Sequence, residues 1–122
     1  MLLLLLLILG CALLHEILAL EHKIVWDTNA ISAASITIAP GDTVVWSWSA
    51  QTHNLLSTAS RGQCQYSGVW GSPDPANNGM YARKFDEVGE FHYFCAIHCG
   101  ALKMFATISV KSKHIIASAL IA

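Results

Sequence analysis

The stretch "YFCAIHCGALKM", residues 93–104, places two cysteines, a histidine and a methionine directly after an apolar, aromatic run. A cluster of thiols, an imidazole and a thioether fits several kinds of chemistry: disulfide partners, a zinc site, a copper site or a nucleophilic thiol. The aromatic residues at its start are typical of a β-strand, so we expect the cluster at a strand end. The surrounding sequence narrows these possibilities.

Strand patterns lie on both sides of the cluster. Residues 81–95 predict two strands separated by a break at 87–89, and residues 104–111 predict a closing strand. Upstream, residues 22–27 are rich in β-branched and aromatic side chains, and residues 35–49 predict a strand pair around a Pro-Gly-Asp turn. The sequence shows no convincing helical period. Many short strands separated by turns predict an all-β sandwich or small barrel.

A long stretch in the middle of the chain carries no strand pattern that we can identify. Residues 54–80 are rich in Ser, Gly, Asn and Pro, as in "SGVWGSPDPANNG". We expect a loop there, with at most one short helix. A loop of this length in a small domain usually shapes a functional site.

The two ends of the chain differ in composition from its centre. Residues 1–20 are almost entirely apolar and predict a secretory signal peptide, with an uncleaved N-terminal membrane anchor as the alternative. Residues 21–111 suit one compact domain. Residues 112–122 form a short apolar tail that is too short to span a bilayer. We therefore expect an extracytoplasmic protein: secreted, periplasmic or at the cell surface.

Charge and cysteine content limit the function further. Beyond residue 20 the acidic and basic side chains balance, without a basic stripe, which gives no support for nucleic-acid binding. Three cysteines remain in that part of the chain, Cys64, Cys95 and Cys99. Because the number is odd, one of them is left over as a reactive or metal-bound thiol.

Four side chains form a coherent set of metal donors: His53, Cys95, His98 and Met104. The last three lie between two predicted strands, and a sandwich can bring His53 to the same end. Two imidazoles and a thiolate in one plane, with a weak axial thioether, are the arrangement of a type 1 (blue) copper site. The sequence therefore predicts one type 1 copper ion. A rigid sandwich around such a site suits an electron carrier, and we see no acid–base pair that would indicate an enzyme.

The same residues resemble a known family, the cupredoxins, and plastocyanin-like domains most closely. The resemblance rests on Tyr93-Phe94-Cys95-x-x-His98 followed by Met104, on Gly89-Glu90-Phe91, and on Thr52-His53-Asn54. It implies a Greek-key sandwich of about eight strands, with copper at one end bound by the four donors. It also implies that Asn54 braces the ligand loop through hydrogen bonds.

The ligand loop departs from the plastocyanin pattern. The segment "CGALK" between His98 and Met104 is one residue longer than in plastocyanins. We interpret this as an insertion that keeps Met104 as the axial ligand. In the alternative, the loop bulges so that Leu102 faces the copper, and Met104 is a simple core residue.

Cys99 points to a second resemblance. A cysteine directly after the ligand histidine is similar to the phytocyanins, which implies a Cys64–Cys99 disulfide and leaves Cys95 as the thiolate on copper. Two alternatives stay open. Cys64 can pair with Cys95, as in an immunoglobulin-like sandwich, or Cys64, Cys95, His98 and Cys99 can form a structural zinc site.

The resemblance also implies how the protein works. It predicts a monomeric blue copper protein that transfers single electrons through the exposed edge of His98. Small and apolar neighbours, Gly100, Ala101 and Leu102, would frame this port for a transient redox partner. The alternatives are an extracytoplasmic copper-binding, storage or cell-surface module without redox traffic, and a copper-free β-sandwich adhesion domain.

Overall fold

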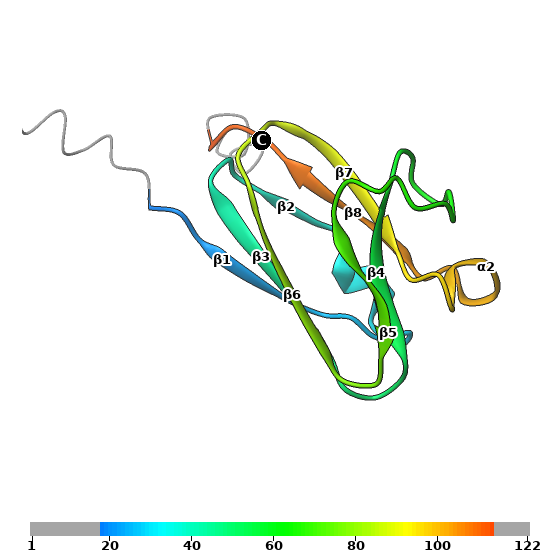
Figure 1. Ribbon diagram of the computed structural model, residues 1–122. Helices are drawn as coiled ribbons and strands as arrows, with labels where there is room; N and C mark the ends of the chain where they lie inside the picture. Colours follow the sequence, from blue (N-terminus) through cyan, green and yellow to red (C-terminus); the bar gives the residue numbers. More distant parts are fainter. Residues whose placement is uncertain (1–17, 114–122) are drawn as a thin grey trace, which may run out of the picture.

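The computed structural model describes residues 18–113 and shows a sandwich of two β-sheets (Figure 1). The predicted signal peptide or anchor up to residue 17, and the predicted tail from residue 114, lie outside the described residues. Among these described residues, eight strands and two short helical turns make up the fold, which confirms the predicted all-β sandwich. Within the described part of the chain, no helix is long and apolar enough to span a membrane.

The strands divide into a three-stranded and a five-stranded sheet. The smaller sheet has the order β1 (Glu21–Val25), β3 (Asp42–Trp48), β6 (Gly79–Phe85). The larger sheet has the order β2 (Ile36–Ile38), β8 (Phe105–Val110), β7 (Gly89–Phe94), β4 (His53–Thr58), β5 (Gly71–Ala76). The helical turns are η1 (Ile31–Ala34) and α2 (Cys99–Leu102).

The two strands predicted within residues 35–49 form, but they do not pair with each other. β2 runs parallel to β8 in the larger sheet, whereas β3 lies between β1 and β6 in the smaller one. The turn between them, with Gly41 at φ 92°, therefore passes from one sheet to the other. Because Ile38 and Val44 then enter the same core from opposite sheets, the connection closes the sandwich instead of making a hairpin.

The main core lies between the two sheets and is rich in aromatic rings. Alternate residues of β3 are buried, among them Trp46, whose ring contacts those of Trp70, Tyr81 and Tyr93. Each large apolar side chain that is fully buried contributes roughly 1.5–3 kcal/mol relative to an exposed one. Cys95 belongs to the same buried cluster, so the core shields the predicted ligand cysteine from solvent.

A second, smaller core covers the outer face of the larger sheet. Leu56, Phe94 and Cys99 are buried there, with Phe105 packed against them. Phe94 points to this side because neighbouring residues of a strand face opposite ways.

The prediction of an irregular stretch over residues 54–80 was wrong. The stretch contains most of β4, all of β5 and the start of β6, and within it residues 59–70 and 77–78 lack regular structure. The sequence of β5, "GSPDPA", reads as a turn because it contains two prolines. β5 is an edge strand that pairs only with β4, and an edge strand tolerates residues without a backbone N–H.

Candidate metal centre

Three predicted donors meet at the end of the sandwich where α2 lies (Figure 1). His53 is the first residue of β4, Cys95 directly follows β7, and His98 directly precedes α2. Nδ1 of His53 and Nδ1 of His98 are 3.2 Å apart, and Sγ of Cys95 is 3.7 Å from each of these nitrogens. The fold therefore brings together atoms that are far apart in the sequence.

The three atoms form a triangle of the size that a metal ion requires. The point equidistant from them lies about 2 Å from each, close to the bond lengths that imidazole nitrogen and thiolate sulfur make with a first-row metal. Two imidazoles and one thiolate in a plane are the equatorial set of a type 1 copper site. The residues present thus fit one copper ion.

Burial prepares the donors for metal binding. His53 and Cys95 are buried, and His98 is half-buried. Burial, followed by the nearby charge of His98, lowers the pKa of His53, so its ring is neutral in neutral solution. A neutral imidazole offers a lone pair to a metal, whereas an imidazolium does not.

The backbone of the ligand loop holds Met104 beside the other donors. The N–H of Cys95 donates to the carbonyl of Met104 at 3.0 Å, and the N–H of Met104 donates to the carbonyl of His98 at 3.2 Å. Met104 is completely buried in the same cluster as Cys95, whereas Leu102 is 50% exposed. The burial favours Met104 as the fourth donor, and it argues against the alternative in which Leu102 faces the copper and leaves it three-coordinate.

The longer loop is accommodated by a single helical turn. Residues Cys99–Leu102 form α2, and Lys103 ends it in the left-handed conformation, with φ 52°. A left-handed residue is a common way to terminate a helix and reverse the chain. The inserted residue is therefore taken up by α2, while Met104 stays next to His98.

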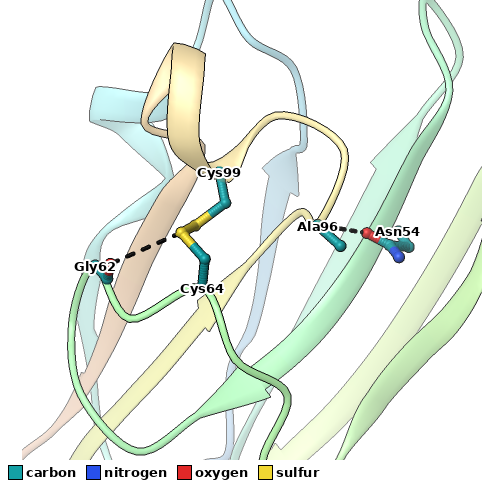
Figure 2. Close-up of a disulfide and its surroundings, with 5 residues drawn as sticks. All are labelled: Asn54, Gly62, Cys64, Ala96 and Cys99. Atoms are coloured by element: carbon teal, nitrogen blue, oxygen red, sulfur yellow. Dashed lines mark hydrogen bonds between the residues drawn. A yellow bond between two sulfur atoms is a disulfide. The ribbon is translucent and has the colours of Figure 1, made fainter.

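Asn54 links the metal loop to two other parts of the fold. Its side-chain oxygen accepts a hydrogen bond from the N–H of Ala96 at 2.8 Å, as Figure 2 shows. Its side-chain nitrogen donates to the carbonyl of Pro73 at 3.1 Å, and its own carbonyl accepts from the indole N–H of Trp26 at 2.9 Å. Asn54 thus holds the loop between Cys95 and His98 against β4 and β5.

The disulfide predicted from the phytocyanin resemblance is confirmed. Cys64 and Cys99 are bonded, with their Cα atoms 5.9 Å apart, and connect residues 59–70 to α2 (Figure 2). Among residues 18–113, Cys95 is the free cysteine. This excludes a Cys64–Cys95 bridge, and it also excludes a zinc site that uses Cys64 and Cys99 as thiolates.

The side chains around His98 on the surface are small or apolar. The predicted neighbours Gly100, Ala101 and Leu102 are exposed. Ile97, which the sequence interpretation missed, is 48% exposed on the same loop. The signal that could have identified Ile97 is its place as an apolar residue between the two predicted ligands Cys95 and His98.

Comparison with known protein families agrees with this geometry. The family described as copper binding proteins of the plastocyanin/azurin family matches residues 21–111. No protein with a curated description matches the chain significantly.

Several solved structures share the fold. A purple cupredoxin from Nitrosopumilus maritimus has a TM-score of 0.59 and 22% identity, covering 74% of this chain and 99% of the other. The pseudoazurin from Sinorhizobium meliloti has a TM-score of 0.57 and 21% identity, covering 80% of both chains. The pseudoazurin from Methylobacterium extorquens has a TM-score of 0.57 and 19% identity, covering 80% of this chain and 82% of the other. At these identities the likeness concerns the fold.

Proposed function

Because the chain belongs to the copper-binding family of plastocyanin and azurin, we propose that it carries single electrons with one type 1 copper ion. The observation that carries the proposal is the convergence of His53, Cys95 and His98 around one point. Bound copper would supply one-electron chemistry by alternating between Cu(I) and Cu(II). The protein residues hold, shield and connect the site.

Each donor has a separate task in this proposal. Cys95, His53 and His98 would hold the copper ion, and Met104 would supply a weak thioether that tunes the reduction potential. Asn54 and the buried core restrict movement of the loop, so that little has to rearrange when the charge changes. Electron transfer through the metal would need no general acid or base, and we therefore propose a carrier.

The half-buried edge of His98 is the proposed electron port. The exposed apolar residues Ile97 and Leu102 flank it and offer a small docking surface for a transient redox protein. A small contact area permits rapid release, as an electron carrier requires. In this proposal the protein works as a monomer.

The proposed place of action is outside the cytoplasm. A disulfide such as Cys64–Cys99 persists in oxidising compartments and is rare in the cytosol. The apolar segment at residues 1–20 supports export as a signal peptide or anchor. N-terminal sequencing of the exported protein distinguishes the two, because only cleavage gives a new terminus near residue 20.

Absorption spectroscopy with added Cu(II) tests the proposal. We expect an intense band in the orange-red region from the Cys95 thiolate, and we expect Cys95→Ser to abolish it. His92→Gln is the matched control, because His92 binds Thr107 on the sheet surface, away from the metal centre. A wild-type protein that stays colourless in Cu(II) contradicts the proposed site.

Voltammetry separates a carrier from a storage or cell-surface binding module. A carrier gives rapid, reversible oxidation and reduction, whereas a storage module binds copper without a reversible wave. Met104→Leu should retain copper but raise the reduction potential, because a weak axial donor is lost. If this variant loses copper altogether, Met104 is not a weak axial ligand.

A further inference from the structure

A polar pocket lies on the outer face of the larger sheet, where β7 and β8 run side by side (Figure 1). Its floor consists of Glu90 and His92 of β7 and of Thr107 and Ser109 of β8, which alternate with core residues of the two strands. Its volume is about 330 Å³, within the range of small-molecule sites. Because its lining includes none of the four proposed copper donors, the pocket is separate from the metal centre.

Arg61 reaches one end of this pocket from the segment 59–70. Its Nη1 donates to the hydroxyls of Ser35 and Thr107, each at 3.1 Å, and its guanidinium lies 5.5 Å from the centre of the Phe105 ring. In the described part of the chain, its other two nitrogens have no hydrogen-bond partner and no carboxylate lies within ion-pair distance. The guanidinium is therefore held in place while its charge and several N–H groups remain available.

Glu90 supplies the opposite charge at the other end of the pocket. Its Oε2 accepts a hydrogen bond from the hydroxyl of Ser109 at 2.7 Å. Among residues 18–113, no cationic side chain lies within ion-pair distance of this carboxylate. Glu90 thus keeps its charge and an acceptor oxygen for another partner.

The sheet keeps these two charges apart. Arg61 is attached to Thr107 and Glu90 to Ser109, and these two anchors are alternate residues of β8, roughly 7 Å apart along the strand. On β7, His92 occupies the position opposite Thr107, which keeps Glu90 at the level of Ser109. The two side chains therefore stay beyond the distance of about 4 Å that a direct ion pair requires.

We propose that this pocket binds a small zwitterion, with the ligand's carboxylate on Arg61 and its ammonium group on Glu90. A ligand with one charge would leave the opposite end of the pocket unpaired, whereas a zwitterion forms charge-assisted hydrogen bonds at both ends. The spacing of the anchors favours charges separated by several bonds. In 4-aminobutyrate, for example, the carboxyl carbon and the nitrogen are about 5 Å apart in the extended form. The proposal does not depend on the proposed electron transfer.

Titrations of ¹⁵N-labelled protein, followed by backbone amide shifts, test the proposal. No metal is added, because amino acids chelate copper. The probe is 4-aminobutyrate, and the matched half-ligands are butyrate, which lacks the amine, and butylamine, which lacks the carboxylate. We expect saturable shifts at residues 90–92 and 107–109, with the probe binding about 10-fold more tightly than either half-ligand, the effect expected of one charge-assisted hydrogen bond. Equal binding of the three compounds, or shifts that do not saturate, would overturn the proposal.

Variants of the two charged residues assign the ends of the pocket. Glu90→Gln should bind 4-aminobutyrate no better than butyrate and should leave butyrate binding unchanged, because only the partner of the ammonium group is lost. Arg61→Gln should bind 4-aminobutyrate no better than butylamine. The controls Lys84→Gln and Glu21→Gln remove exposed charges from the smaller sheet and should resemble the wild type. Since Arg61 also holds the segment 59–70, Glu90→Gln decides the matter if Arg61→Gln is unstable. A preference for 4-aminobutyrate over butyrate that survives in Glu90→Gln overturns the proposal.

Discussion

Single residues hold the two ends of this sandwich in different ways. At the metal end, Asn54 uses its side-chain oxygen, its side-chain nitrogen and its carbonyl to connect three segments. At the opposite end, the charged side chain of Asp42 likewise connects separate segments of the chain. Its buried carboxylate accepts the N–H groups of Leu20 and Ala39 and pairs with the ring of His22. In both cases, a buried polar group is stable because its hydrogen-bonding capacity is used.

Asp42 makes the stability of the folded protein depend on pH. Burial alone raises the pKa of Asp42, but the bonds from Leu20, His22 and Ala39 together lower it below the ordinary value of 3.8. A carboxyl group with a lowered pKa contributes stability above its ordinary pKa and loses it as the pH falls through the lower folded-state value.

Asp42→Asn tests this contribution. We expect the variant to lose about 2 kcal/mol of unfolding free energy at pH 7, the usual cost of removing hydrogen bonds to a charged group. The difference from the wild type should shrink below pH 3.8. Urea unfolding at pH 7 and pH 3 measures it, with the exposed Asp86→Asn as control. A difference that stays constant with pH contradicts the assignment.

At the scale of elements, residues 59–70 owe their order to attachments to other parts of the fold, among them the hydrogen bonds of Ser67 and Trp70 to Ser57 of β4. The disulfide joins them to α2, and Arg61 donates hydrogen bonds to the hydroxyls of Ser35 and Thr107 at 3.1 Å. Residues 59–70 cover the small outer core but have no regular structure of their own. Their position therefore depends on long-range contacts.

Removing the disulfide should loosen this cover. The bridge spans 35 residues, and a loop of this length is expected to contribute about 3–4 kcal/mol by restricting the unfolded chain. We expect the double variant Cys64→Ser/Cys99→Ser to lose that much in urea unfolding. The wild type reduced with a dithiol should lose a similar amount. A loss below about 1 kcal/mol in both would contradict the structural role of the bridge.

The edge strand β5 depends on one glycine. Gly71 has φ 139°, and a Cβ there would lie 2.2 Å from the carbonyl oxygen of Leu55. Because that oxygen belongs to the backbone of β4, it cannot move aside without breaking the strand pair.

We expect Gly71→Ala to destabilise the protein by at least about 2 kcal/mol, from backbone strain and the clash together. The control Gly100→Ala should be neutral or stabilising by about 0.5–1 kcal/mol, because an added Cβ meets nothing within 4 Å and alanine favours helix. Thermal unfolding of both variants checks this. Equal stability of the two would show that β4 and β5 separate without cost.

For the whole molecule, the metal centre joins segments that are far apart in the chain. Cys95 and His53 are 42 residues apart, and the donors belong to the start of β4 and to the loop after β7. A ligand that binds only the folded protein stabilises it in proportion to the logarithm of its concentration over Kd.

Metal loading should therefore raise the Tm strongly. With free metal at 1,000 times Kd, the free energy of unfolding rises by about 4 kcal/mol. This corresponds to an increase in Tm of roughly 15–30 °C for a domain of this size. Calorimetry with the redox-inert Zn(II) and with copper measures it, and removal of the metal by a chelator should reverse it. Cys95→Ser should show a much smaller shift. An equal shift in this variant would place the bound metal elsewhere.

Several features of the protein were determined by the sequence itself. The pattern of residues 35–49 predicted two strands around a turn, because strand propensity and turn chemistry are local properties. The donor types of His53, Cys95, His98 and Met104 predicted copper chemistry, because metal preference depends on the ligating atoms. The Cys64–Cys99 bridge followed from a family resemblance in the motif.

Other features were decided only by the tertiary structure. β5 forms because β4 supplies its hydrogen-bond partners, although its prolines read as a turn. β2 and β3 lie in different sheets, because pairing depends on partners distant in sequence. The burial of Met104 likewise depends on how separate segments pack. The residue types in one segment determine its local chemistry and strand pattern. Which segments become neighbours in the fold depends on long-range contacts that no single segment specifies.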